Sequence, residues 1–193
     1  MIAYLFWHRP REDAASDSYE RSQMAFHRSL AHRPPVGLRA SALFALEGAP
    51  WLAPQGRCYE DWYLLEDFAA LGVLNEAAVG RGHRSAHEQA AHGFGAGGLY
   101  ALLEGELDAD ALARAPLAVW VARPPGSARR ALGELLGDGM DPARASLWRR
   151  QLVLGPAPEF CVLAAEPPAG VAPARLPAGW SATALRREAL WHG

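Results

Sequence analysis

Three side chains that could carry out acid–base chemistry lie in two short segments of the sequence. His8 ends the segment YLFWH (residues 4–8), while Asp61 and Tyr63 alternate within YEDWYLLED (residues 59–67). An imidazole titrates near neutral pH, so it can accept or release a proton during catalysis. A buried carboxylate needs a partner, because an unpaired buried charge is costly. We therefore interpret His8 as a candidate general acid or base, with Asp61 and Tyr63 orienting it or a substrate.

Each of these three residues also has a structural interpretation. His8 could be a hydrogen-bonded side chain at the end of a strand. Asp61 and Tyr63 could form an outward polar face while Trp62 and Leu64 lie in the core. Asp61 could also be the ion-pair partner of an arginine. The sequence leaves these alternatives open.

The segment WRRQ (residues 148–151) is a candidate for binding an anionic group. Arg149 and Gln151 alternate with Trp148 and Arg150, so one arginine is expected to face inward. An inward arginine can bind a carboxylate or another anion. We take Arg149 and Gln151 as candidate ligand-binding residues, and the alternative is an ion pair with Asp61 or with a surface acid.

Two histidines form a weak candidate for a metal site. His83 and His87 are four residues apart and would share one face of a helix, as some metal-binding pairs do. The segment is not an HExxH motif, because Glu88 follows the second histidine. The alternative is a solvated surface helix, and the sequence favours no metal.

The composition is that of an ordinary globular protein. The chain has 193 residues, of which half are hydrophobic, and its formal net charge is −2. A balanced charge gives no reason to expect nucleic acid or an anionic membrane as a partner. The N-terminus lacks the features of a signal peptide, and no apolar run is long enough to span a membrane. We expect a bacterial, cytoplasmic protein that binds a small molecule.

Hydrophobic periodicity and the positions of Pro and Gly predict the order of the elements. The glycines of GFGAGGLY (residues 93–100) follow a predicted helix rather than a strand, so they are expected to cap that helix and not to bind a dinucleotide. The predicted strands are residues 2–8, 37–47, 57–66, 97–106, 117–123, 145–154, 159–166 and 182–191. The predicted helices are residues 17–32, 67–79, 82–93 and 126–137.

The chain divides into two halves with the same order of elements. In each half, a first strand ends close to an Arg-Pro pair, at Arg9-Pro10 and Arg123-Pro124. A helix, two strands and a last strand follow, but a Pro-rich loop replaces the second helix of the second half. We predict two ferredoxin-like units, residues 1–107 and residues 116–193, the second without its second helix.

Two consecutive ferredoxin-like units resemble the dimeric α+β-barrel superfamily. That group includes antibiotic-biosynthesis monooxygenases, EthD-like proteins, muconolactone isomerases and chlorite-dismutase-like haem proteins. The resemblance covers nearly the whole chain and rests on the order of elements, since no catalytic motif of a family matches residue by residue. It implies an α+β fold in which two four-stranded antiparallel sheets pack face to face as a barrel. The chain could close this barrel as a monomer, or exposed sheet edges could pair into a homodimer.

The first strand has two different faces. The face expected to contact helices consists of Ala3, Leu5 and Trp7, and the face expected to line the lumen consists of Tyr4, Phe6 and His8. In the matching strand of the second half, Trp120 is expected to face the lumen. Tyr4, Phe6 and Trp120 are therefore candidate ligand-binding residues.

These observations lead to one preferred function and two alternatives. The preferred function is a cofactor-free enzyme that acts on a small hydrophobic or aromatic molecule in the barrel lumen. The first alternative is a non-catalytic protein that binds a flat apolar ligand such as haem. The second is a structural protein whose lumen is filled by side chains.

Overall fold

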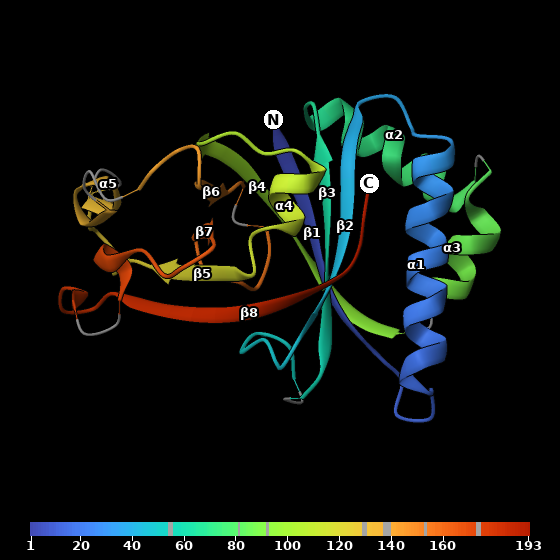
Figure 1. Cartoon of the computed structure of the whole chain (residues 1–193), viewed down its shortest axis with the longest axis horizontal. Coiled ribbons are helices and arrows are strands. Elements are labelled where there is room, and N and C mark those ends of the chain that lie inside the picture. Colours follow the sequence, from blue (N-terminus) through green and yellow to red (C-terminus); the bar gives the residue numbers. More distant parts are fainter. Residues whose placement is uncertain are drawn as a thin grey trace.

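The eight strands of the computed structural model form one closed antiparallel barrel (Figure 1). Around the barrel, the strand order is β1-β3-β2-β8-β5-β7-β6-β4. The structure describes residues 1–53, 56–80, 82–91, 93–128, 131–136, 140–152, 154–172 and 175–193. The predicted α+β barrel is therefore confirmed.

In the part of the first half that the structure describes, four strands and three helices are present. Helix α1 ends at His32, just before Pro34-Pro35, and Asp67 caps α2 by accepting a hydrogen bond from the Ala70 backbone N–H. The elements are β1 (Ile2–Pro10), α1 (Ser16–His32), β2 (Leu38–Leu46), β3 (Cys58–Leu65), α2 (Phe68–Val79), α3 (Arg84–Ala90) and β4 (Gly93–Glu104). The order predicted from periodicity is confirmed. Gly93 and Gly95 lie inside β4, so the prediction that they cap a helix is wrong, whereas Gly97 and Gly98 lie in the strand as predicted.

The second half is shorter and has little helix. A short helix, α4 (Ala109–Ala113), precedes it in a segment where we predicted no element. The elements that follow are β5 (Leu117–Ala122), α5 (Ala131–Leu136), β6 (Ala145–Arg150), β7 (Phe160–Ala164), the 3-10 turn η2 (Ala169–Val171) and β8 (Ser181–His192). Positions 129, 130 and 137 of the predicted helix lie outside the described residues.

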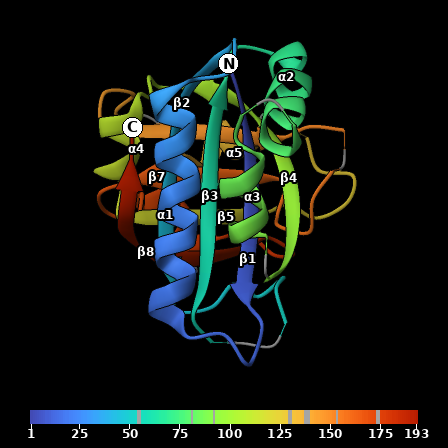
Figure 2. The ribbon, with the colours of Figure 1, turned by 90° about the vertical axis from the view of Figure 1, so that its right-hand side faces the viewer.

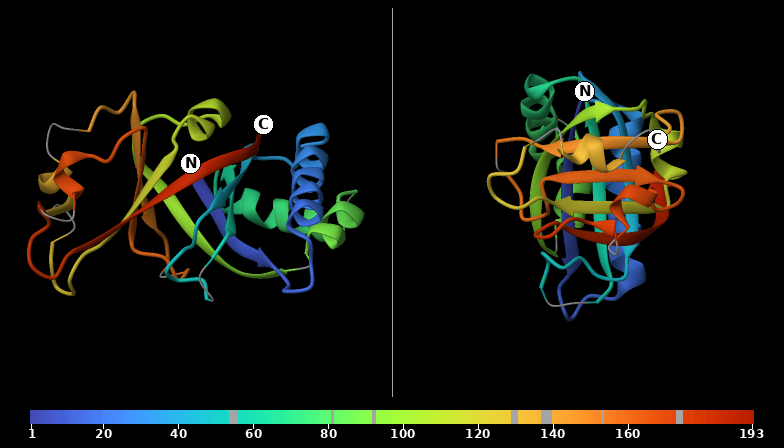
Figure 3. Two further views of the ribbon diagram at one scale, coloured as in Figure 1. Left: turned by 60° about the horizontal axis from the view of Figure 1, so that its bottom comes forward. Right: turned by 90° about the vertical axis from the view of Figure 1, so that its left-hand side faces the viewer.

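Both halves use the same strand order and meet at two seams. The order is β4-β1-β3-β2 in the first half and β8-β5-β7-β6 in the second. In each half, the fourth strand therefore lies beside the first. Strand β2 pairs with β8 at one seam and β4 pairs with β6 at the other. Figure 3 shows the strands of the second half, in yellow to red, crossing those of the first half, in blue and green. A duplication and the boundaries 1–107 and 116–193 remain predictions.

Helices cover the outer face of the first sheet and leave the inner face to the barrel. Figure 2 shows α1, α2 and α3 over the sheet of β1, β2, β3 and β4, with α1 on the β2 side and α2 and α3 toward β4. Leu132 and Leu136 of α5 and Val171 of η2 pack on the outer face of the second sheet. Among the described residues, no helix is long and apolar enough to cross a membrane.

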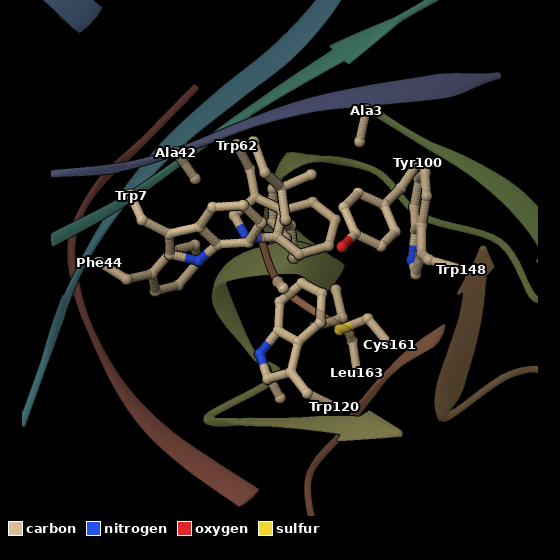
Figure 4. Close-up of a cluster of buried hydrophobic side chains, with 14 of the residues drawn as sticks. Ala3, Trp7, Ala42, Phe44, Trp62, Tyr100, Trp120, Trp148, Cys161 and Leu163 are labelled. Atoms are coloured by element: carbon tan, nitrogen blue, oxygen red, sulfur yellow. The ribbon is translucent and has the colours of Figure 1, made fainter. Parts of the chain in front are cut away.

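Large aromatic side chains fill the lumen (Figure 4). The ring centroids of Trp7 and Trp120 are 5.4 Å apart, as are those of Trp62 and Trp148. All four indoles are fully buried, and each removes roughly 150–250 Å² from water. The lumen is therefore a packed core.

The predicted orientation of the first strand is wrong. Trp7, with Ala3 and Leu5, points into the lumen, whereas Tyr4 and His8 point outward, beneath the helices. The second half follows the prediction, because Trp120 lies in the lumen. The alignment of the two halves on their Arg-Pro pairs is wrong by one residue in this strand. In the structure, Trp7 occupies the position that corresponds to Trp120, so His8 lies on the opposite face. A slip of one residue exchanges the two faces of a strand, because side chains alternate with a period of two.

One buried ion pair joins the two halves across the lumen. Arg187 of β8 donates from Nη1 to Oε1 of Glu60 on β3, with 3.3 Å between the two atoms, and both side chains are fully buried. Glu60 also accepts hydrogen bonds from the indole N–H groups of Trp7 (2.7 Å) and Trp62 (2.6 Å). The remaining arginine donors reach the backbone carbonyls of Leu112 and Ala115.

Candidate functional site

The candidate site lies on the outer face of the first sheet, beneath α1 and α3. Strand β1 pairs antiparallel with β3, and this register sets Phe6 opposite Asp61 and His8 opposite Tyr59. Outward side chains of the two strands therefore lie side by side, and His8 comes within reach of Asp61. His8, Asp61 and Tyr63 do converge as the sequence predicts, but under the helices and not in the lumen.

Asp61 is the centre of a buried hydrogen-bonded cluster. Its Oδ1 lies 3.1 Å from Nε2 of His27 and 3.3 Å from Nε2 of His8. Its Oδ2 accepts a hydrogen bond of 3.2 Å from the Tyr63 hydroxyl. The contact to His8 is close but lacks hydrogen-bond geometry, so Nε2 of His8 has no aligned partner.

The second nitrogen of each histidine faces a hydroxyl group. Nδ1 of His8 lies 2.7 Å from the Tyr19 hydroxyl, and Nδ1 of His27 lies 2.9 Å from the Ser41 hydroxyl. His8 is 1% exposed and His27 is 0% exposed. Because a hydroxyl can either donate or accept, each pair can hold a histidine in its neutral or in its protonated form.

The surroundings keep Asp61 ionised and keep the nearby phenols protonated. Burial alone raises the pKa of Asp61, but the positive potentials of His8 and His27 and the hydrogen bond from His27 outweigh it and hold that pKa well below its usual range. Burial and the charge of Asp61 raise the pKa values of Tyr63 and Tyr19. The cluster therefore offers one carboxylate acceptor and two phenol donors.

Two adjoining cavities open next to this cluster. The smaller, about 160 Å³, borders His8, Tyr19 and Asp61. The larger, about 540 Å³, lies between the sheet and α2 and is mostly apolar. The residues that border both cavities are Phe6, Phe26, Tyr63 and His87. A small apolar molecule in the larger cavity would thus reach the acid–base cluster at one end.

The glycine-rich part of β4 lies against the aromatic side chains of β1 that line the larger cavity. A Cβ at Gly95 would lie 2.4 Å from Cζ of Phe6, and one at Gly97 would lie 2.7 Å from the Tyr4 hydroxyl. Glycine at both positions lets the aromatic rings of β1 lie across β4. The glycines of the GFGAGGLY segment thus leave space for the aromatic side chains of β1, which the sequence analysis did not predict.

The other predicted ligand-binding residues divide between the two sides of the sheet. Tyr4 and Phe6 line the larger cavity, although that cavity lies outside the barrel. Trp120 packs in the lumen between Trp7, Trp51 and Tyr100, away from the cluster.

The WRRQ segment does not reach the site. Trp148 points into the lumen and Leu147 toward α5, so alternation puts Arg149 on the outer face of the second sheet. Arg150 is the arginine on the lumen side, and its Nη1 donates to the carbonyls of Gly155 (3.1 Å) and Ala157 (2.6 Å). Gln151 donates to the Arg149 carbonyl. Among the described residues, the arginine that is buried in the lumen is Arg187, which the sequence analysis missed.

The two histidines of the HRSAH segment have separate surroundings. Nδ1 of His83 lies 2.7 Å from the Ser29 hydroxyl and Nε2 lies 3.1 Å from the Arg33 carbonyl, so both nitrogens are engaged within the protein. His87 packs edge-on against Phe26 and borders both cavities. The i, i+4 pair therefore does not converge on a metal. No group of three or more His, Cys, Asp or Glu side chains suited to a metal occurs among the described residues.

Helix α1 supplies the site residues that sequence reasoning missed. Tyr19, Gln23 and His27 lie on its buried face with Phe26 and Leu30. The sequence contains a sign of these site residues, because polar side chains interrupt the row of apolar residues that are spaced as on one face of a helix. A buried polar side chain needs a hydrogen-bond partner, so such an interruption points to a site.

Comparison with known proteins supports the fold. No protein-family model and no curated protein sequence matches the chain. The crystal structure of a protein of Fusobacterium nucleatum subsp. nucleatum ATCC 25586, named "putative monooxygenase", superposes with a TM-score of 0.60 at 9% identity and covers 99% of this chain and 93% of its own. A protein of Lactobacillus acidophilus NCFM with the same name gives a TM-score of 0.48 at 9% identity, over 96% and 93% of the two chains. The first similarity shows that the two proteins share a fold.

Proposed function

We propose that the protein is an enzyme that moves a proton on a small hydrophobic or aromatic molecule bound beneath α1, α2 and α3. His8 acts as the acid or base, and Asp61 and Tyr63 orient it or the substrate. The observation that carries this proposal is the buried His8–Asp61 pair, which borders a cavity of about 160 Å³ that adjoins an apolar cavity of about 540 Å³. An imidazole–carboxylate pair can move a proton by itself, so the proposal needs no resident cofactor.

The energetic cost of the cluster supports a function beyond packing. Burying a carboxylate is expensive even when it is paired, and apolar side chains of similar volume often stabilise a core as well or better. Asp61 remains ionised in this buried place because His8 and His27 lower its pKa. Such clusters beside a cavity are typical of catalytic sites.

Hydrogen–deuterium exchange on a bicyclic ketone tests this proposal. In 2-tetralone, the C–H group between the aromatic ring and the carbonyl is acidic, and the molecule is apolar and compact. We expect the protein to accelerate exchange of this proton in D2O, followed by ¹H NMR, and expect His8→Ala to lose most of the acceleration. His32→Ala, which changes an exposed histidine at the end of α1, is the matched control and should behave as the wild type.

Two results would contradict the proposal. One is exchange that is equally fast with His8→Ala. The other is absence of catalysed exchange for a series of bicyclic ketones and naphthols that NMR shows to bind at Phe6 and His87. The Fusobacterium protein is named a monooxygenase, and monooxygenases consume dioxygen. Dioxygen consumption is therefore measured with the same ketones and naphthols.

A second candidate is a non-catalytic protein that binds a flat apolar ligand such as haem. His87 favours it, because an imidazole on the wall of an apolar cavity is a common axial ligand of haem iron. Titration with haemin decides between the candidates: a Soret band that depends on His87, with no catalysed exchange, would support the binding protein.

A further inference from the structure

We infer that Tyr19 is the catalytic residue that touches the substrate, and that its hydroxyl relays a proton between the substrate and Nδ1 of His8. This inference rests on the proposed function and assigns a residue to its first step. It follows from which atom of His8 faces which neighbour.

The two nitrogens of His8 have different neighbours. Nε2 lies 3.3 Å from Oδ1 of Asp61, and Nδ1 lies 2.7 Å from the Tyr19 hydroxyl. Although this contact is not an aligned hydrogen bond, an ionised carboxylate can only accept and repels a bare nitrogen lone pair, so the nitrogen that faces it carries the hydrogen. Nδ1 is therefore the basic nitrogen of neutral His8, and the Tyr19 hydroxyl covers it. Carboxylate, imidazole and hydroxyl follow one another in the order that activates a hydroxyl in catalytic triads.

The Tyr19 side chain both contacts His8 and borders the smaller cavity. His8 and Asp61 border that cavity as well. Gly93 of β4 makes room for Tyr19, because a Cβ at that position would lie 2.5 Å from the tyrosine hydroxyl oxygen. Gln23, one turn further along α1, donates from Nε2 to the Ala90 carbonyl and so ties this part of α1 to α3. The hydroxyl is thus held in place by its neighbours.

The relay balances without any other reactant. The acidic C–H or O–H bond of the substrate breaks, its proton goes to the Tyr19 oxygen, and the electron pair remains on the substrate. In the same step the hydroxyl proton of Tyr19 passes to Nδ1 of His8. The imidazolium that forms lies beside the carboxylate of Asp61, which stabilises it. Burial raises the pKa of Tyr19, so the two transfers are concerted and no free phenolate forms.

The test removes one oxygen atom. Tyr19→Phe should lower the rate of 2-tetralone exchange by about 100-fold or more, the size of a general acid–base contribution, with little change in tetralone binding. Tyr100→Phe is the matched control, because it removes a buried hydroxyl that donates to the Pro158 carbonyl outside the site. It should leave the exchange rate unchanged.

A second measurement does not depend on activity. The ¹H–¹⁵N spectrum of the His8 ring in the wild-type protein should show a hydrogen on Nε2 and a bare, hydrogen-bonded Nδ1. In Tyr19→Phe, the Nδ1 resonance should move toward the position of a free pyridine-type nitrogen.

The outcomes separate the relay from the proposed function. Wild-type exchange that persists unchanged in Tyr19→Phe overturns the relay and leaves the proposed function standing. A His8 ring with its hydrogen on Nδ1 and none on Nε2 overturns the relay whatever the activity. Absence of exchange in the wild type overturns the proposed function and the relay with it.

Discussion

Glu60→Gln should destabilise the protein strongly, because it removes the charge that balances Arg187 in the lumen. Both side chains are fully buried, and both oxygens of Glu60 are engaged, Oε1 by Trp62 and Arg187 and Oε2 by Trp7. A glutamine keeps one acceptor oxygen and turns an N–H donor toward groups that are themselves donors. Leaving one member of a buried ion pair without its partner costs about 3–5 kcal/mol.

The free energy of unfolding is measured in urea, and the melting temperature by heating, both with tryptophan fluorescence as the signal. A loss of about 3–5 kcal/mol corresponds to a lowering of the melting temperature by about 6–20 °C for a chain of this length. Glu88→Gln is the matched control. Glu88 pairs with Arg84 on the surface of α3, where both side chains are more than half exposed, and such pairs contribute about 0–1 kcal/mol.

A double-mutant cycle isolates the pair itself. The variant with both Glu60→Gln and Arg187→Met should lose less stability than the sum of the two single variants, with a coupling of about 0.5–3 kcal/mol. The reasoning is refuted if Glu60→Gln costs no more than Glu88→Gln, or if the two single losses simply add.

Two further predictions concern the outer face of the first sheet. Asp61 faces His8, His27 and Tyr63, and its pKa in the folded protein lies below its unfolded value of about 3.9. The ionised carboxylate therefore stabilises the folded protein above about pH 3.9, and this stabilisation is lost as the pH falls through the folded-state pKa. The stability difference between wild type and Asp61→Asn should therefore shrink in unfolding curves from pH 6 to pH 3, and a constant difference would contradict this. Gly95→Ala should cost about 1–3 kcal/mol in unfolding measurements because it pushes on the Phe6 ring, whereas Gly133→Ala in α5, which meets no atom within 4 Å, should cost nothing or stabilise; equal effects would refute the packing argument.

The local pattern of the sequence predicts which residues share a face. Alternation in YEDWYLLED separates Asp61 and Tyr63 from Trp62 and Leu64, and the structure keeps that separation. The structure also brings His8 to Asp61, as expected from adjacent first and third strands. These predictions succeeded because the period of a strand is a property of the backbone.

The same pattern does not say which face of the sheet the helices cover. We assigned Tyr4, Phe6 and His8 to the lumen because this face is mixed and aromatic, and the alignment of the Arg-Pro pairs, one residue out of register, matched it with Trp120. In the structure, Trp7 lies in the lumen with Trp120, and the lumen site that we expected is filled by indoles. Which face of β1 points into the lumen depends on packing between segments more than a hundred residues apart. In the lumen a large indole fits, whereas an imidazole would lose its hydrogen-bond partners.

By itself, the sequence determined the order of elements, the α+β barrel and the polar residues that share one face of β1 and β3. Only the tertiary structure decided that this face lies under α1, that Tyr19 and His27 of α1 complete the cluster around Asp61, and that Arg187 reaches Glu60 from the other half. The physical reason is that periodicity is local, whereas a buried charge is satisfied by whatever donors the packing of distant segments brings to it.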